Sequence, residues 1–95
     1  MITVKRSSGS ISIKGHAHYA EPGKDIVCAG VSTLAQSLIY SIRELTGDEI
    51  QVDTQPGSAE IKYGTLSAEA QLLIKSFFIG VNLIAGEFPE NVRIV

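Results

Sequence analysis

The chain has 95 residues, enough for one domain, with 8 Lys and Arg against 10 Asp and Glu and a net charge of −2. That balance gives no basic footprint for nucleic acid or an anionic membrane surface. With 44% apolar and 19% charged residues the composition is globular, which excludes an intrinsically disordered chain. The single cysteine, Cys28, fits a reducing compartment, and one cysteine with two histidines does not make up a metal site by itself.

Neither end of the sequence carries a targeting pattern. The first residues have no apolar signal-peptide core behind their charges. The longest uncharged run, 26–42, is interrupted by glycine, serine, threonine and glutamine, whereas a membrane span needs about 20 predominantly apolar residues. We therefore expect a buried helix in a cytoplasmic protein without a membrane partner.

The first predicted element is a β-hairpin. Isoleucine and valine alternate with polar residues in 2–5, isoleucine alternates with them in 11–14, and a Ser-Ser-Gly-Ser turn lies between. This period of two predicts strands with one apolar face. An irregular stretch, 15–24, follows and contains both histidines and a Pro-Gly turn pair.

The period then changes to that of a helix beginning at Ile26. Apolar residues recur at spacings of three and four as Val27, Val31, Leu34, Leu38, Ile42 and Leu45. Asp25 occupies the predicted N-cap, where its carboxylate could accept a backbone N–H. Gly47 is predicted to end the helix as its C′ residue.

A second hairpin is predicted next, with Ile50 and Val52 before the turn sequence Gln-Pro-Gly-Ser at 55–58 and Ile61 and Tyr63 after it. Its two strands show the same alternation as the first hairpin. The sequence therefore predicts four strands before the second helix.

The second helix is predicted to begin after Ser67, with Glu69 in its first turn, where the helix dipole favours an anion. Gly86 is predicted as its C′ residue, with Pro89 just beyond. The segment 91–95 is predicted to form a short closing strand.

Apolar residues surround almost the whole circumference of this second helix: Leu72, Leu73, Ile74, Phe77, Phe78, Ile79, Val81, Leu83 and Ile84. Such a helix must be buried on several sides, either centrally in the domain or partly against a second copy of the chain. We favour a symmetric homodimer. The expected fold is a single α+β domain over 1–95, with two hairpins and a short C-terminal strand packed against two long helices.

Two residue types that carry chemistry lie close to the start of the first helix. Cys28 falls in its first turn, where free N–H groups and the dipole favour a thiolate. His16 ends the preceding strand, and the intervening loop is long enough to bring imidazole to thiol. A Cys-His pair is the smallest unit that performs acyl transfer. On spacing alone, a buried packing thiol and a structural histidine remain open alternatives.

The sequence Gly-His-Ala at 15–17, followed by Gly-Lys-Asp-Ile-Val-Cys-Ala-Gly-Val-Ser at 23–32, resembles the ribosomal-processing cysteine protease family, Prp. The resemblance extends over essentially the whole chain. It implies an endopeptidase that removes the N-terminal extension of large-subunit ribosomal protein twenty-seven, as a small homodimer without metal or cofactor. Related chains encoded in prophages imply capsid or scaffold proteins as alternative substrates.

Carried onto this sequence, the resemblance puts the nucleophile on Cys28 and the base on His16. It puts the family's motif glycine on Gly15, its aspartate on Asp25 and its serine on Ser32.

The roles of the supporting residues stay open. Asp25 could orient His16 as the third member of a triad, or cap the helix by accepting the Cys28 N–H, which we favour. Ser32, one turn after Cys28, could bond the Cys28 carbonyl, help to place the thiol, or have no catalytic part. Backbone N–H groups of 26–29 are the expected oxyanion donors.

The loop is expected to contact substrate through Ala17, His18, Tyr19 and Gly23. His18 is the rival of His16 as the base, but two residues apart their rings would face opposite ways in an extended segment. The loop could move to admit substrate or be a static connection, and Tyr19 could contact substrate or anchor the loop.

The function we expect is therefore that of a cytoplasmic cysteine endopeptidase with a protein substrate. The rival is a non-catalytic, ribosome-associated binding module in which Cys28 only packs. Alkylation of the thiol below neutral pH would separate the two.

Overall fold

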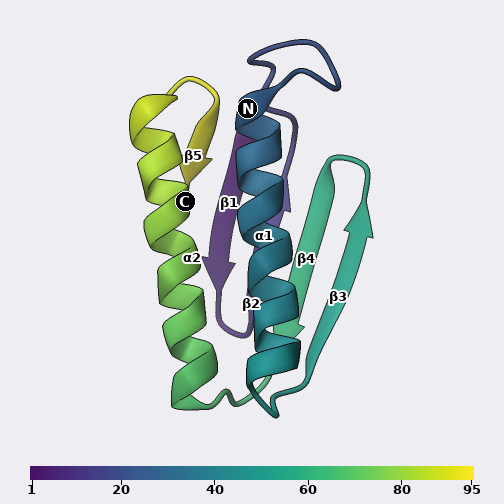
Figure 1. Ribbon diagram of the computed structural model, residues 1–95, viewed down its shortest axis with the longest axis vertical. Helices are drawn as coiled ribbons and strands as arrows, with labels where there is room; N and C mark the ends of the chain where they lie inside the picture. Colours follow the sequence, from purple (N-terminus) through teal and green to yellow (C-terminus); the bar gives the residue numbers. More distant parts are fainter.

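The computed structural model describes residues 1–95 as a five-stranded sheet with both helices on one of its faces (Figure 1). Along the chain the elements are β1 Ile2–Ser7, β2 Ser10–Lys14, α1 Ile26–Leu45, β3 Ile50–Gln55, β4 Ser58–Tyr63, α2 Ala68–Glu87 and β5 Val92–Ile94. The predicted α+β class, both hairpins and the closing strand are confirmed.

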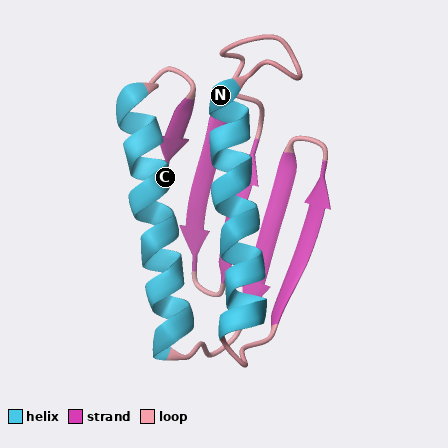
Figure 2. Ribbon diagram, viewed as in Figure 1, coloured by secondary structure: helices cyan, strands magenta, loops and turns pink.

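The strand order in the sheet is β3-β4-β2-β1-β5 (Figure 2). The two hairpins join through antiparallel pairing of β2 with β4, while β5 lies parallel to β1 and pairs Val92 with Ile2. The first and last strands of the chain therefore lie side by side. The start of α1, the end of α2 and the turn between β3 and β4 all lie at one end of the molecule (Figure 1).

The predicted apolar faces form one core between the sheet and the helices. The strands contribute Ile2, Val4, Ile11, Ile13, Ile61 and Val92; α1 contributes Val27, Val31, Ala35, Leu38, Ile39 and Ile42; α2 contributes Ala70, Ile74, Phe77 and Val81. Alternate strand residues such as Lys5, Lys14 and Lys62 lie on the opposite, solvent-exposed face. The period-two alternation in the sequence thus corresponds to one buried and one exposed face.

The helix starts agree with the sequence. Asp25 caps α1 by accepting the N–H groups of Val27 and Cys28, and Ser67 caps α2 by accepting that of Ala70. Each short polar side chain satisfies N–H groups that have no partner within the helix.

The helix ends differ from the sequence prediction. Gly47 follows the end of α1 but is not left-handed; Thr46 ends the helix by donating both its N–H and its hydroxyl to the Ile42 carbonyl. Gly86 was predicted as a C′ residue, yet it lies inside α2, which continues to Glu87 because its last apolar turn still packs on the domain.

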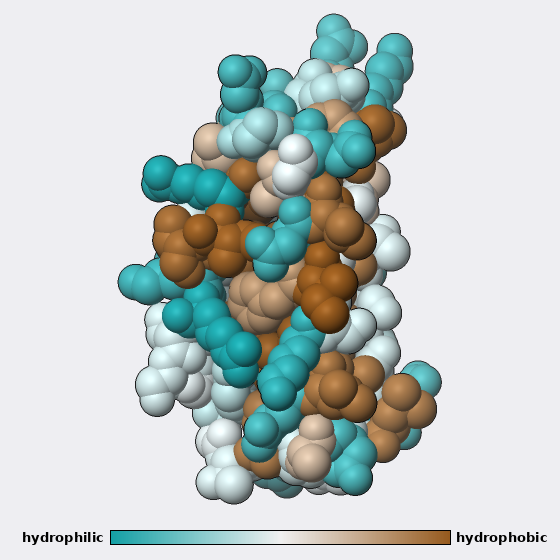
Figure 3. Space-filling view, turned by 90° about the vertical axis from the view of Figure 1, so that its left-hand side faces the viewer, coloured by the Kyte–Doolittle hydropathy of each residue, from teal (hydrophilic) through white to brown (hydrophobic).

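The second helix is not central. It buries one face, while Leu72, Ile79 and Leu83 are 64–69% exposed. The face of the molecule on the α2 side shows apolar patches interspersed with polar side chains (Figure 3). The sequence left two alternatives for α2, a central position in the domain or a face turned to a second copy of the chain. The central position is wrong, because this face of the helix is exposed.

By length and composition alone, α1 and α2 would each be long and apolar enough to cross a membrane. Core helices of soluble domains pass the same test. Here each helix lays its buried face on the same five-stranded sheet.

Candidate active site

His16 and Cys28 both lie at the end of the molecule where the loop leaves β2 and enters α1. Both line a cavity of about 530 Å³ under the loop, together with His18, Ala20, Pro22, Gly23, Asp25, Ala29 and Ser32. Both also line a second cavity of about 350 Å³ between α1 and the tip of the β3–β4 hairpin. The two cavities share His16, Cys28 and Ser32, so open space flanks the thiol on two sides.

Cys28 is the third residue of α1 and its side chain is half-buried. Its Sγ accepts the backbone N–H of Ala17 at 3.3 Å. The helix N-terminus and this donor both place partial positive charge at the sulfur.

Asp25 connects the loop to the helix with both carboxylate oxygens. Oδ1 accepts the N–H groups of Val27 and Cys28, each at 3.0 Å. Oδ2 accepts those of Tyr19 at 2.9 Å and Ala20 at 3.2 Å. The carboxylate is thus committed to backbone amides, which agrees with the capping interpretation and leaves no contact that would orient His16.

The same four bonds have an electrostatic effect. The N–H of Cys28 first, and those of Ala20, Tyr19 and Val27 after it, hold the pKa of the Asp25 carboxyl below its ordinary value. Each bond stabilises the charged form, and together they outweigh the partial desolvation that acts in the opposite direction.

The His16 imidazole lies against the backbone of Gly57 in the β3–β4 turn, where a Cβ would be 2.7 Å from Nε2. No hydrogen bond joins the ring to Cys28 in this structure, and its centroid is 6.0 Å from that of His18. The ring nevertheless lines both cavities with the thiol. Catalytic hydrogen bonds are often loose before substrate binds.

The motif glycine and serine have distinct surroundings. Gly15 has a φ of +100°, and a Cβ there would overlap the Met1 carbonyl oxygen, so both conformation and space require glycine. Ser32 lies on the exposed surface of α1 and lines both cavities, but its hydroxyl makes no hydrogen bond to the Cys28 carbonyl.

The four loop residues divide into two pairs. His18 and Gly23 line the larger cavity, and both have positive φ, +54° and +84°. Ala17 is buried and Tyr19 packs edge-to-face on Phe88 with centroids 5.0 Å apart. The structure therefore agrees with an anchoring role for Tyr19, and Ala17 presents no side chain to either cavity.

The expected oxyanion donors are mostly occupied. The N–H groups of Val27 and Cys28 bind the Asp25 side chain, and that of Ala29 binds the Asp25 carbonyl. The prediction that the amides of 26–29 are free is wrong for these three, because the N-cap residue Asp25 accepts their hydrogen bonds.

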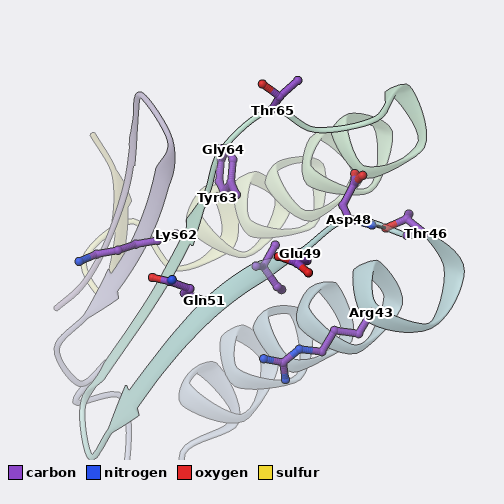
Figure 4. Close-up of a pocket in the computed structure, with 11 residues that line it drawn as sticks. Arg43, Thr46, Asp48, Glu49, Gln51, Lys62, Tyr63, Gly64 and Thr65 are labelled. Carbon is purple, nitrogen blue, oxygen red and sulfur yellow. Dashed lines mark hydrogen bonds between the residues drawn. The ribbon is translucent and has the colours of Figure 1, made fainter.

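A larger cavity, about 910 Å³, lies at the other end of α1 and is lined mainly by polar residues of the segments 46–49 and 64–65 and of the adjoining ends of α1, β3 and β4 (Figure 4). Arg43 and Lys62 border it together with Asp48, but it contains neither a cysteine nor a histidine. The Asp48 carboxylate there accepts the N–H and hydroxyl of Ser67, so it serves the start of α2. Size alone does not indicate the site of chemistry.

Three residues at the site were not singled out from the sequence: Gly57, Phe88 and Asn91. Gly57 was recognised only as part of a turn, and its contact with His16 depends on the β2–β4 pairing. Asn91 donates from Nδ2 to the carbonyl of Ala17 at 2.9 Å across 74 positions of sequence, which no local pattern signals.

A family model described as Cysteine protease Prp matches residues 1–93. The chain belongs to this family. The ribosomal processing cysteine protease Prp of Staphylococcus aureus is 33% identical over 87 residues, which cover 88% of this chain and 82% of that protein. The protein of the same name in Bacillus subtilis is 29% identical over 103 residues, covering 97% and 92%.

The Prp fold is also shared in three dimensions. A crystal structure of an essential ribosomal processing protease Prp from S. aureus, in complex with a covalently linked product peptide, superposes with a TM-score of 0.92. Identity is 29%, covering 99% of this chain and 97% of that one. As a Prp family member, the chain is a cysteine protease.

Proposed function

We propose that this Prp protein cleaves a peptide bond through Cys28 as nucleophile and His16 as general base. The observation that carries the proposal is the position of the Cys28 sulfur, which lies at a helix N-terminus, accepts a backbone N–H, and shares both cavities with His16. Cys28 is also the only cysteine in the chain, so a cysteine protease has no other candidate.

The reaction follows from these two groups. His16 takes the proton of the Cys28 thiol, and the thiolate attacks the scissile carbonyl carbon. The C–N bond breaks as the imidazolium returns its proton to the leaving amine, which leaves a thioester on Cys28. Water, deprotonated by His16, then attacks the thioester, releases the new carboxylate and restores the thiol.

The substrate proposed is the N-terminal extension of large-subunit ribosomal protein twenty-seven. Relatives in two bacteria bear the name ribosomal processing protease, which supports a ribosomal protein as substrate. The cavity between α1 and the β3–β4 turn has apolar walls from Ile13, Val31 and Ile39 and suits an apolar side chain next to the scissile bond.

The assembly proposed is a cytoplasmic homodimer whose interface is the exposed apolar face of α2, defined by Leu72, Ile79 and Leu83. These large apolar side chains are exposed to solvent, and contact with a second copy of the chain would bury them. Neither a metal nor a cofactor takes part in the proposed reaction, because thiol and imidazole together complete the proton and acyl transfers.

The test is intact-mass spectrometry after incubation with unprocessed large-subunit ribosomal protein twenty-seven. One discrete cut, absent with Cys28→Ala, is the expected result. A reactive thiol without any cut would reject the ribosomal substrate and direct the search to phage capsid or scaffold proteins. An inert thiol without any cut would reject the catalytic assignment.

A further inference from the structure

Ala17 is held from both sides of its Cα. Its N–H donates to Cys28 Sγ at 3.3 Å, and its carbonyl accepts from Asn91 Nδ2 at 2.9 Å. Its side chain is 1% exposed, so core packing adds a third constraint. Two hydrogen bonds and core packing therefore hold the residue whose N–H faces the sulfur.

Asn91 is itself fixed in the turn between α2 and β5. Its N–H donates to the Phe88 carbonyl at 3.0 Å, and its carbonyl accepts the N–H of Ile2 at 2.8 Å. With both backbone groups bonded, the side chain projects from a rigid base. Asn91 thus links the end of α2, β1 and the loop between β2 and α1.

The same turn contacts the loop a second time. Phe88 packs edge-to-face on Tyr19, with ring centroids 5.0 Å apart. Aromatic rings favour this edge-to-face geometry, so the pair stabilises the position of the loop on the turn. The turn 88–91 therefore holds the loop on each side of His18.

We propose that Asn91 is a positioning residue for the nucleophile, acting by holding Ala17 so that its N–H faces the Cys28 sulfur. The proposal rests on the proposed function, in which Cys28 attacks the substrate. Asparagine suits the position because its amide donates to a carbonyl, whereas an aspartate would place an acceptor against an acceptor. Asn91 touches no reacting atom, so its effect must pass through Ala17.

The test compares Asn91→Ala and Asn91→Asp with Asn82→Ala, a matched control. Asn82 also donates to a backbone carbonyl, that of Phe78 at 2.8 Å, but does so on the exposed surface of α2. Two readouts are used: kcat and KM on a precursor peptide, and the rate of iodoacetamide alkylation of the thiol between pH 5 and 9.

Loss of one hydrogen bond predicts a fall in kcat of about fivefold to tenfold for Asn91→Ala, with KM nearly unchanged. Alkylation of the thiol below neutral pH should be slower than in the parent, because the N–H of Ala17 no longer faces the sulfur. The other titratable groups that line the site, His16, His18 and Asp25, are the same in every variant. Asn82→Ala should match the parent in both readouts.

A folded Asn91→Ala enzyme with parental kcat and alkylation profile would overturn the proposal, as would a change in KM alone. If Asn91→Asp fails to fold, Asn91→Ala alone tests the proposal. This variant should still fold, because the Ala17 carbonyl can bind water in place of the Asn91 amide. Cleavage that survives in Cys28→Ala would instead refute the nucleophile assignment, so the two failures are distinguishable.

Discussion

Gly57 and His16 are in direct contact: a Cβ at position 57 would lie 2.7 Å from Nε2 of the imidazole. The β3–β4 turn therefore sets how far the ring can swing from the thiol. Gly57→Ala should displace His16 and lower kcat by about 100-fold, the effect of a shift of about 1 Å in a catalytic group. It should also lower stability by about 1 kcal/mol, because Gly57 has a φ of +72°.

Gly9→Ala is the control for backbone strain. Gly9 has a similar φ of +76° but lies in the other hairpin turn, against the Tyr63 carbonyl. Steady-state kinetics and thermal unfolding of both variants are the measurements. A Gly9→Ala enzyme that loses as much kcat as Gly57→Ala would show that the loss comes from strain and not from His16.

Asp25→Asn should uncouple the loop from the start of α1. The amide oxygen still accepts hydrogen bonds, but the NH2 group takes the place of one carboxylate oxygen, Oδ1 or Oδ2. It then faces the two N–H groups that this oxygen binds in the parent protein. We expect faster hydrogen exchange at Tyr19 and Ala20 and a kcat lowered by up to about 100-fold. Asp48→Asn, at the start of α2, should lower stability while leaving kcat unchanged.

The charge of Asp25 also predicts a pH dependence. Because its pKa is lowered in the folded protein, its stabilising effect is complete above the ordinary carboxyl pKa and is lost as pH falls through the lowered one. The protection of the Tyr19 N–H, its exchange rate relative to the intrinsic rate at the same pH, should thus be constant from neutral pH down to about pH 4 and be lost only below it. Loss of protection that begins well above this pH would contradict the assignment to Asp25.

His16→Ala should lower kcat by about 100-fold or more, as expected for loss of a general base. His18→Ala should keep most of the activity. His18 has a φ of +54°, so His18→Gly should raise the free energy of unfolding by about 1 kcal/mol. Kinetics and urea unfolding check these values, and a larger kinetic loss for His18 than for His16 would reverse the choice of base.

The homodimer proposal predicts that Leu83→Glu converts the protein to a monomer in sedimentation experiments. Because Leu83 is 69% exposed, the substitution should change the stability of the monomer by about 0.5 kcal/mol or less. Leu45→Glu, at an equally exposed leucine in the last turn of α1, should remain a dimer. An unchanged sedimentation coefficient for Leu83→Glu would place the interface elsewhere.

The elements of this fold could be predicted because each is encoded locally. Alternation defined the strands, a three-four spacing defined α1, and Asp25 and Ser67 marked both helix starts. The helix ends were harder to predict. Gly86 is typical of the residue after a helix, but tertiary packing extends α2 past it to Glu87. The pairing of β2 with β4 and of β1 with β5 has no local signal.

The residues of the candidate site likewise divide into those with a local sequence signal and those without one. The position of Cys28 at a helix start could be predicted from the sequence, and the family motif favoured Cys28 and His16 over their alternatives. His16 was expected to end the strand, but β2 ends at Lys14 and His16 lies in the loop. The groups that surround these two residues could not be predicted, because the order of strands in the sheet brings Gly57 to His16 and Asn91 to Ala17. The expected free amides of 26–29 failed for a local reason, since the N-cap that marks the helix also occupies them.

The claim that Cys28 is the nucleophile is tested most directly by acid quench during turnover of a precursor peptide, followed by intact-mass spectrometry and peptide mapping. The account predicts a transient species heavier by the acyl part of the peptide, with the mass on Cys28, and none in Cys28→Ala. Cleavage that proceeds without any covalent species, or that persists in Cys28→Ala, would contradict it.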